Sequence, residues 1–161
     1  MRISTVREQD LDCRHCGEKC DQELIESHGQ NFCCEGCRMV YEILLENDLD
    51  NFYCVAESPG ISSKKKKTHN FEFLKDEAFA NSLLDVKNEE ISKIRFYIPA
   101  IHCSACIWLL EKLYKLNAGI ISSRVDFNKK TVIISFKHQE ISLLDLVKLL
   151  DSIAYTPDIQ L

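Results

Sequence analysis

Two cysteines three positions apart, Cys103 and Cys106, are the residues of this sequence best suited to chemistry. They follow a β-like run over 94–98 and stand at the mouth of an apolar helical run. A helix beginning near Ser104 would bring both sulfurs to one point just off its N-terminus, where unpaired N–H groups and the helix dipole favour thiolate over thiol. Two soft thiolates suit a soft ion such as Cu(I) better than a hard one.

A second set of cysteines lies in the first third of the chain and predicts a small finger. Cys13-x-x-Cys16-Gly17 precedes a short predicted hairpin with strands at 24–25 and 31–33, and Cys34-x-x-Cys37 opens a helix over 38–47. This order predicts a treble-clef-like finger with Zn(II) as the default ion in a closed site. Some fifty residues bury too little apolar surface to stand unaided, so an ion would supply stability. The expected zinc ligands are Cys13, Cys16, Cys34 and Cys37.

The finger has more thiols than one site needs. Cys20 and Cys33 are possible additional ligands, and they leave room for a transfer or sensing role beside the favoured structural one. We expect His15 and His28 to be exposed turn residues and Cys54 to be a small core residue.

Composition narrows the class of protein. Nine cysteines, an odd number without an export signal, indicate metal sites in a reducing compartment and not disulfides. The net charge of −5 is uneven: residues 1–54 carry five basic and twelve acidic side chains, hence −7, whereas residues 93–161 carry nine and six, hence +3. This balance argues against nucleic-acid binding. No apolar run reaches the length of a membrane helix, so a soluble, cytosolic chain is expected.

Three segments follow from these patterns. Residues 1–54 form the finger. Residues 55–92 read as a linker, turn-rich and then basic at 64–67, that carries a short amphipathic helix at about 71–84. Residues 93–161 alternate as strand 94–98, helix 104–116, strands 120–127 and 131–136, a helix capped by Ser142 that runs through 153, and an edge strand over 156–161. That order is the ferredoxin-like βαββαβ arrangement, so the fold class is α+β.

Residues 93–161 resemble the heavy-metal-associated domain, whose loop Gly-Met-x-Cys-x-x-Cys corresponds here to Ala100-Ile101-His102-Cys103-Ser104-Ala105-Cys106. With the upstream finger, nearly the whole chain is similar to the cytosolic N-terminus of copper-transporting P-type ATPases that serve assembly of cbb3-type cytochrome oxidase. The resemblance implies Cu(I) on Cys103 and Cys106, loading by a soluble copper chaperone, and delivery to, or regulation of, the pump's actuator and transmembrane parts in an inner or plasma membrane.

The sequence departs from that family at the loop. Ala100 and Ile101 replace Gly and Met, and Ala154 replaces a Gly before Tyr155. Ile101 can fill the same core space, and Ala100 implies that no positive φ is needed there. Tyr155 matches the aromatic lid of ATPase modules, where soluble chaperones tend to have Lys. His102 is a possible third ligand.

The pump's own machinery is absent from this chain, which lacks an Asp-Lys-Thr-Gly-Thr motif, an intramembrane Cys-Pro-Cys and an ATP-binding sequence. We therefore expect an excised regulatory region that is not itself an enzyme, although the parent would be an ATP-driven copper translocase. Two alternatives remain open. One is a thiol–disulfide oxidoreductase that uses the same CxxC, and the other is a zinc-stabilised interaction scaffold.

The helix after the CxxC is apolar nearly all round. Ile107, Leu110 and Tyr114 make one stripe, Trp108, Leu109 and Leu113 make another, and one sheet can cover only one stripe. We hypothesise that Trp108 and its neighbours bury against the finger, the 71–84 helix or absent parts of the pump.

Overall fold

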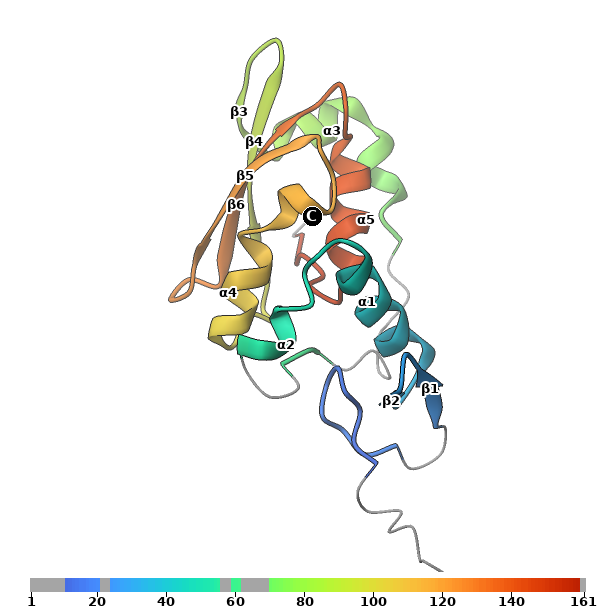
Figure 1. The fold of residues 1–161 in the computed structure, drawn as a ribbon. Helices are drawn as coiled ribbons and strands as arrows, with labels where there is room; N and C mark the ends of the chain where they lie inside the picture. Colours follow the sequence, from blue (N-terminus) through green and yellow to red (C-terminus); the bar gives the residue numbers. More distant parts are fainter. Residues whose placement is uncertain (1–10, 21–23, 56–58, 62–69, 160–161) are drawn as a thin grey trace, which may run out of the picture.

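A four-stranded antiparallel sheet forms the larger part of the molecule, with helices α4 and α5 on one face (Figure 1). The computed structural model describes residues 11–20, 24–55, 59–61 and 70–159. The sheet order is β3-β4-β6-β5. Its elements are β3 (Leu84–Lys87), β4 (Ile91–Tyr97), α4 (Ser104–Leu110), a 3-10 helix (Leu113–Lys115), β5 (Ile120–Asp126), β6 (Thr131–Lys137) and α5 (Leu143–Ser152).

The predicted α+β, ferredoxin-like order is confirmed over most of its length. Along β4 and β6 buried and more exposed residues alternate, which is the pattern of a sheet packed on one face. Ser142 caps α5 as predicted, because its Oγ accepts a hydrogen bond from the Asp145 N–H at 3.1 Å.

The expected edge strand over 156–161 is reduced to one bridge between Tyr97 and Asp158. Pro157 has no N–H to give a ladder, and β3 already pairs with the rest of the same β4 edge. Residues 160 and 161 lie outside the described part of the chain.

The middle segment differs from the single helix predicted over 71–84. It contains a 3-10 helix (Glu72–Lys75), the short helix α3 (Glu77–Ser82) and then β3. Asp76 ends the first and caps the second, since its carboxylate accepts from the N–H groups of Ala78 and Phe79. Residues assigned to the linker thus contribute an edge strand to the sheet. The lysine run at 64–67 lies outside the described residues.

The N-terminal part contains the predicted cysteine-framed finger. Strands β1 (Ile25–Ser27) and β2 (Gln30–Phe32) pair across a tight turn in which His28 and Gly29 both have positive φ, as a two-residue hairpin turn requires. Helix α1 (Glu35–Glu46) follows, and after a short turn comes α2 (Phe52–Val55).

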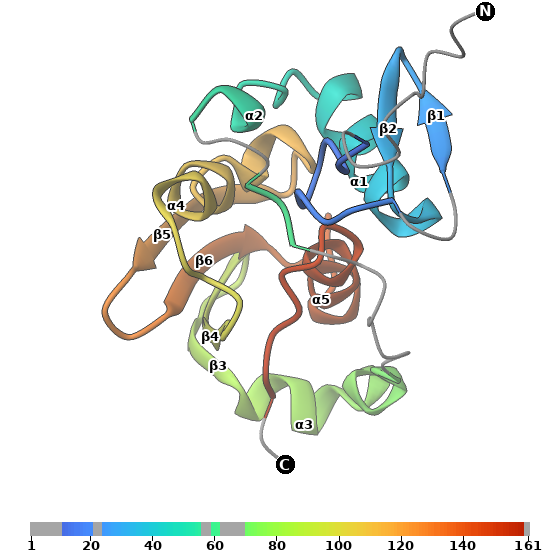
Figure 2. The same ribbon diagram turned by 90° about the horizontal axis from the view of Figure 1, so that it is seen from below.

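The finger and the sheet module share one hydrophobic core. Helix α2 packs against α4, on the side of α4 that faces away from the sheet (Figure 2). One continuous cluster contains Leu44 and Phe52 from the finger side together with Leu109 and Leu110 of α4. Trp108 is half-buried and packs against this cluster, while the Lys112 ammonium lies over its ring. The second apolar stripe of α4 is therefore covered from within the chain.

A shared core predicts that the described parts unfold together. Leu109→Ala should lower the free energy of unfolding by about 2–5 kcal/mol, because it leaves a cavity between the sheet and α2. Urea titration followed by Trp108 fluorescence and by far-UV circular dichroism should give coincident transitions. The control Val86→Ala, at a side chain 53% exposed, should change stability by no more than about 0.5 kcal/mol. Two separate transitions in the unsubstituted chain would contradict a common core.

Candidate metal centres

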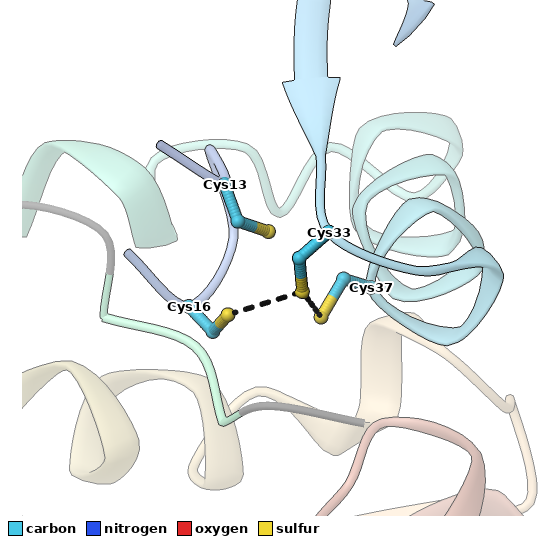
Figure 3. Close-up of side chains that lie close together, drawn as sticks. All are labelled: Cys13, Cys16, Cys33 and Cys37. Carbon is cyan, nitrogen blue, oxygen red and sulfur yellow. Dashed lines mark hydrogen bonds between the residues drawn. The ribbon is translucent and has the colours of Figure 1, made fainter. Parts of the chain in front are cut away.

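Four cysteines of the finger converge on one point: Cys13, Cys16, Cys33 and Cys37. All four Sγ atoms lie within 4.8 Å of one another (Figure 3). The Sγ of Cys33 is 3.6 Å from that of Cys16 and 3.7 Å from that of Cys37. A tetrahedral Zn(II) with Zn–S bonds of about 2.3 Å separates its sulfurs by roughly 3.8 Å, so these thiols fit a four-sulfur zinc site.

Three short elements position these thiols. The knuckle that carries Cys13 and Cys16 turns at Gly17, the residue after Cys16. Glycine adopts its φ of 80° at little cost, and its N–H donates a hydrogen bond to the Cys13 carbonyl oxygen at 2.9 Å. Cys33 follows the last residue of β2, and Cys37 lies in the first turn of α1. The end of the hairpin and the start of α1 therefore place Cys33 and Cys37 close together.

The expected ligand set needs one correction, because Cys33 and not Cys34 completes the cluster. Helix α1 begins at Glu35, so Cys34 is its N-cap with extended backbone and lies half-exposed beside the site. Its Sγ is 3.9 Å from that of Cys33. Cys20 is half-buried and packs against the cluster without joining the four. Cys54, expected in the core, is exposed.

The thiols of the cluster do not share one protonation state. Hydrogen bonds from Cys16 and Cys37 hold the pKa of Cys13 far below its usual range. Burial raises the pKa of Cys33, and donating to Cys13 raises the pKa of Cys16. A cation that binds all four sulfurs must displace thiol protons.

The second group joins His102, Cys103 and Cys106 at the start of α4. The two Sγ atoms are 3.5 Å apart, and the His102 Nδ1 lies 3.4 Å from the Cys106 Sγ and 2.9 Å from the Ala100 carbonyl oxygen. Helix α4 begins at Ser104, as the sequence predicts, so Cys103 stands in the loop and Cys106 in the first turn. Cys106 is fully buried, whereas His102 is exposed.

Burial has the largest effect on the pKa of Cys103. Partial desolvation, reinforced by the neighbouring Cys106, raises the pKa of its thiol above the usual value. This direction runs against the expectation that the helix terminus favours the thiolate form of Cys103.

Tyr155 closes the second group from the core side. It is 1% exposed, and its hydroxyl donates a hydrogen bond to the Cys106 Sγ at 3.0 Å. Burial raises the pKa of this phenol, so it remains a donor. Ile101 is fully buried, as expected from its place in the loop, and Ala100 has no positive φ. Ala154 does have a positive φ of 68°, where glycine would fit without strain.

His15 is a buried polar residue that the sequence did not reveal. It was expected in an exposed turn, yet it is 1% exposed, and its Nδ1 lies 2.8 Å from the Tyr53 hydroxyl. Its Nε2 is buried with no hydrogen-bond partner among the described residues, a condition that costs about 1–3 kcal/mol. Burial lowers its pKa from 6.5 to about 4, so the ring is neutral at pH 7. Only the long-range partners Tyr53 and Gly60 could have revealed this.

The fold and the two thiol clusters together define an α+β protein with two groups of side chains able to hold metal ions. Residues 12–88 match the family described as "Putative metal-binding domain of cation transport ATPase". Comparison with curated proteins finds no match. Among solved structures, the chain is similar to the crystal structure of oxidized MerP from Ralstonia metallidurans CH34, at 20% identity and a TM-score of 0.40 over 44% of this chain and 99% of that one. No helix in the described segments is long and apolar enough to cross a membrane.

The ligand correction is directly testable. Cys33→Ser should abolish stoichiometric zinc binding by the finger, because a neutral hydroxyl cannot replace a buried thiolate ligand. Cys34→Ser, its neighbour and matched control, should keep about one zinc per chain. Metal analysis after anaerobic purification and equilibration with a weak chelator measures both variants. Zinc lost from Cys34→Ser and kept by Cys33→Ser would restore the original assignment.

Removal of the Tyr155 hydroxyl tests its contact with Cys106. Tyr155→Phe should lower the unfolding free energy of the metal-free chain by about 1 kcal/mol, since a buried hydrogen bond is lost and the ring is kept. Tyr97→Phe removes a hydroxyl from a side chain 44% exposed and should be neutral. Urea unfolding under reducing conditions gives the free energy of unfolding of both variants. Equal losses in the two variants would contradict a stabilising hydrogen bond from Tyr155 to Cys106.

Proposed function

We propose that this chain binds Cu(I) through Cys103 and Cys106 and passes it to, or uses it to regulate, the membrane part of a copper-transporting ATPase. The observation that carries the proposal is the pairing of two thiols 3.5 Å apart on the loop of a ferredoxin-like module, directly beside a finger that matches a family of cation-transport ATPases. Soft thiolates select soft ions, and the pair offers few ligands to a harder one.

The arrangement of the pair supports binding with exchange. Cys103 is half-exposed and can meet an incoming donor, whereas Cys106 is buried and held by the Tyr155 hydroxyl. A partner thiol can therefore approach from the Cys103 side, and the ion can pass between sulfurs without being released to water. We propose a soluble copper chaperone as the donor and the actuator or transmembrane part of the pump as the receiver. His102 stands near enough to serve as a third ligand during exchange.

In the finger, Zn(II) on Cys13, Cys16, Cys33 and Cys37 fits a structural role. The four sulfurs would complete a closed shell around the ion and hold the knuckle, the hairpin and α1 together. This role also supports placing the chain as a domain on the cytoplasmic side of a membrane protein, where thiols stay reduced.

The oxidoreductase alternative would use the same two thiols but needs no bound copper. The scaffold alternative needs no copper at all, so a binding experiment separates it from the proposal.

The double variant Cys103→Ser, Cys106→Ser should lose about one tightly bound Cu(I) per chain and keep its fold, because serine replaces each thiol with little change of volume. Anaerobic competition with a chromophoric Cu(I) chelator gives the stoichiometry, and circular dichroism checks the fold. Cys54→Ser, at an exposed cysteine outside both clusters, is the control. Undiminished chelator-resistant Cu(I) in the double variant would refute the proposal.

A further inference from the structure

A chain of aromatic rings runs from the four-cysteine cluster to α2. Phe32 lies buried among the finger's cysteines, and its ring centroid is 5.0 Å from that of Tyr41, which in turn is 5.0 Å from that of Tyr53. Tyr53 makes an edge contact with Phe52 at 5.2 Å. Phe32, Tyr41, Tyr53, Phe52 and His15 form what we call the aromatic bridge. Tyr41 packs against both the finger's core and the shared core.

His15 anchors the finger end of the bridge. It stands between Cys13 and Cys16, so any movement of that knuckle moves its ring. Three contacts hold His15 in place. Its Nδ1 lies 2.8 Å from the Tyr53 hydroxyl, and its carbonyl oxygen accepts a hydrogen bond from the Gly60 N–H at 2.6 Å. Gly60 also packs against the imidazole ring. A Cβ at Gly60 would come within 2.2 Å of the imidazole. The ring therefore has little room for a second position.

Tyr53 leads to the second centre. It belongs to α2, which packs against α4, and α4 carries Cys106. Tyr155, the hydrogen-bond donor to Cys106, lies in the same continuous core as Tyr53. Packed contacts thus run from the knuckle to the buried sulfur.

A bound ion would contribute much of the stability of the knuckle, because the finger has almost no apolar core of its own. Its separate buried cluster consists of Cys13, Phe32, Cys33 and Cys37, so three of its four members are metal-ligand candidates. With an ion bound, these side chains hold the knuckle in place. Without one, the knuckle and His15 keep their backbone hydrogen bonds and the contacts with Tyr53 and Gly60 but lose the bonds through the ion, so they are held less firmly.

We propose that the aromatic bridge couples the two centres, so that metal in the four-cysteine cluster tightens ion binding at Cys103 and Cys106. His15 and Tyr53 act as positioning residues: a loaded finger holds His15 against Tyr53, which keeps α2 on α4 and Cys106 beneath Tyr155. The proposal rests on the proposed function of Cys103 and Cys106. Because coupling is reciprocal, an ion at that pair must also tighten metal binding in the finger by the same factor.

The test compares four full-length chains: unsubstituted, Cys33→Ser, Tyr53→Phe, and both substitutions together. All are purified anaerobically with zinc, and Cu(I) affinity is measured by chelator competition while Trp108 fluorescence, two residues from Cys106, reports filling of that pair. Relative to the unsubstituted chain, Cys33→Ser should weaken Cu(I) binding by about fivefold or more. Relative to Tyr53→Phe alone, the double variant should bind Cu(I) less than about twofold more weakly. Tyr97→Phe, which removes an exposed hydroxyl, should leave the larger ratio intact.

Two outcomes overturn the coupling: an effect of Cys33→Ser below about twofold when Tyr53 is kept, or an equal effect with and without Tyr53→Phe. Amide hydrogen exchange of α4 provides a readout that needs no copper. Zinc removal should speed exchange across Ser104–Leu110 in the unsubstituted chain, whereas Tyr53→Phe should exchange faster even with zinc bound. Unchanged exchange in α4 on zinc removal also contradicts the coupling.

The two readouts separate the coupling from the proposed function. If Cu(I) binds at Cys103 and Cys106 but neither its affinity nor α4 exchange responds to the finger, the coupling is wrong and the function stands. If α4 exchange responds to zinc and to Tyr53→Phe while none of the chains binds Cu(I), the structural link from the finger to α4 stands and the proposed function is wrong.

Discussion

Helix α4 is apolar on two faces, and the architecture depends on covering both. One face lies on the sheet and the other meets α2 of the finger, and Leu109 and Leu110 are both buried in the core that these parts share. A seven-residue helix has little stability of its own, so packing on both sides holds it in place. That packing fixes the geometry of the loop that contains Cys103 and of the helix turn that contains Cys106. The arrangement of the thiol pair is thus a property of the whole core.

The finger has a small core and is stabilised differently from the sheet module. Its buried leucines and valine lie in the core shared with the sheet module, whereas its own separate cluster consists of three cysteines and Phe32. Those sulfurs stabilise the fold most when an ion joins them. Its hydrophobic surface is directed outward, through α1 and α2, onto the second module. The chain therefore divides its stabilising interactions between coordination on one side and apolar burial on the other.

Local patterns in the sequence were sufficient for most of the elements and their order. Alternation along β4 and β6, the Ser142 cap and the His28-Gly29 turn each depend on neighbours a few residues away, and each was predictable. The choice between Cys33 and Cys34 was not, because it depends on whether α1 begins one residue earlier or later. The burial of His15 depends on Tyr53, 38 positions away. The edge position taken by β3 is likewise decided by competition for β4, which no single segment reveals.

Gly60 lies in a stretch whose composition suggests a freely variable tether. Its hydrogen atom faces the His15 imidazole at a distance where no carbon would fit. Gly60 therefore tolerates few other residue types, and the reason is the space beside the imidazole and not backbone flexibility. In related chains, variation here should be linked to the residue at position 15, since a smaller side chain in the knuckle would be the simplest way to admit a larger one in the tether.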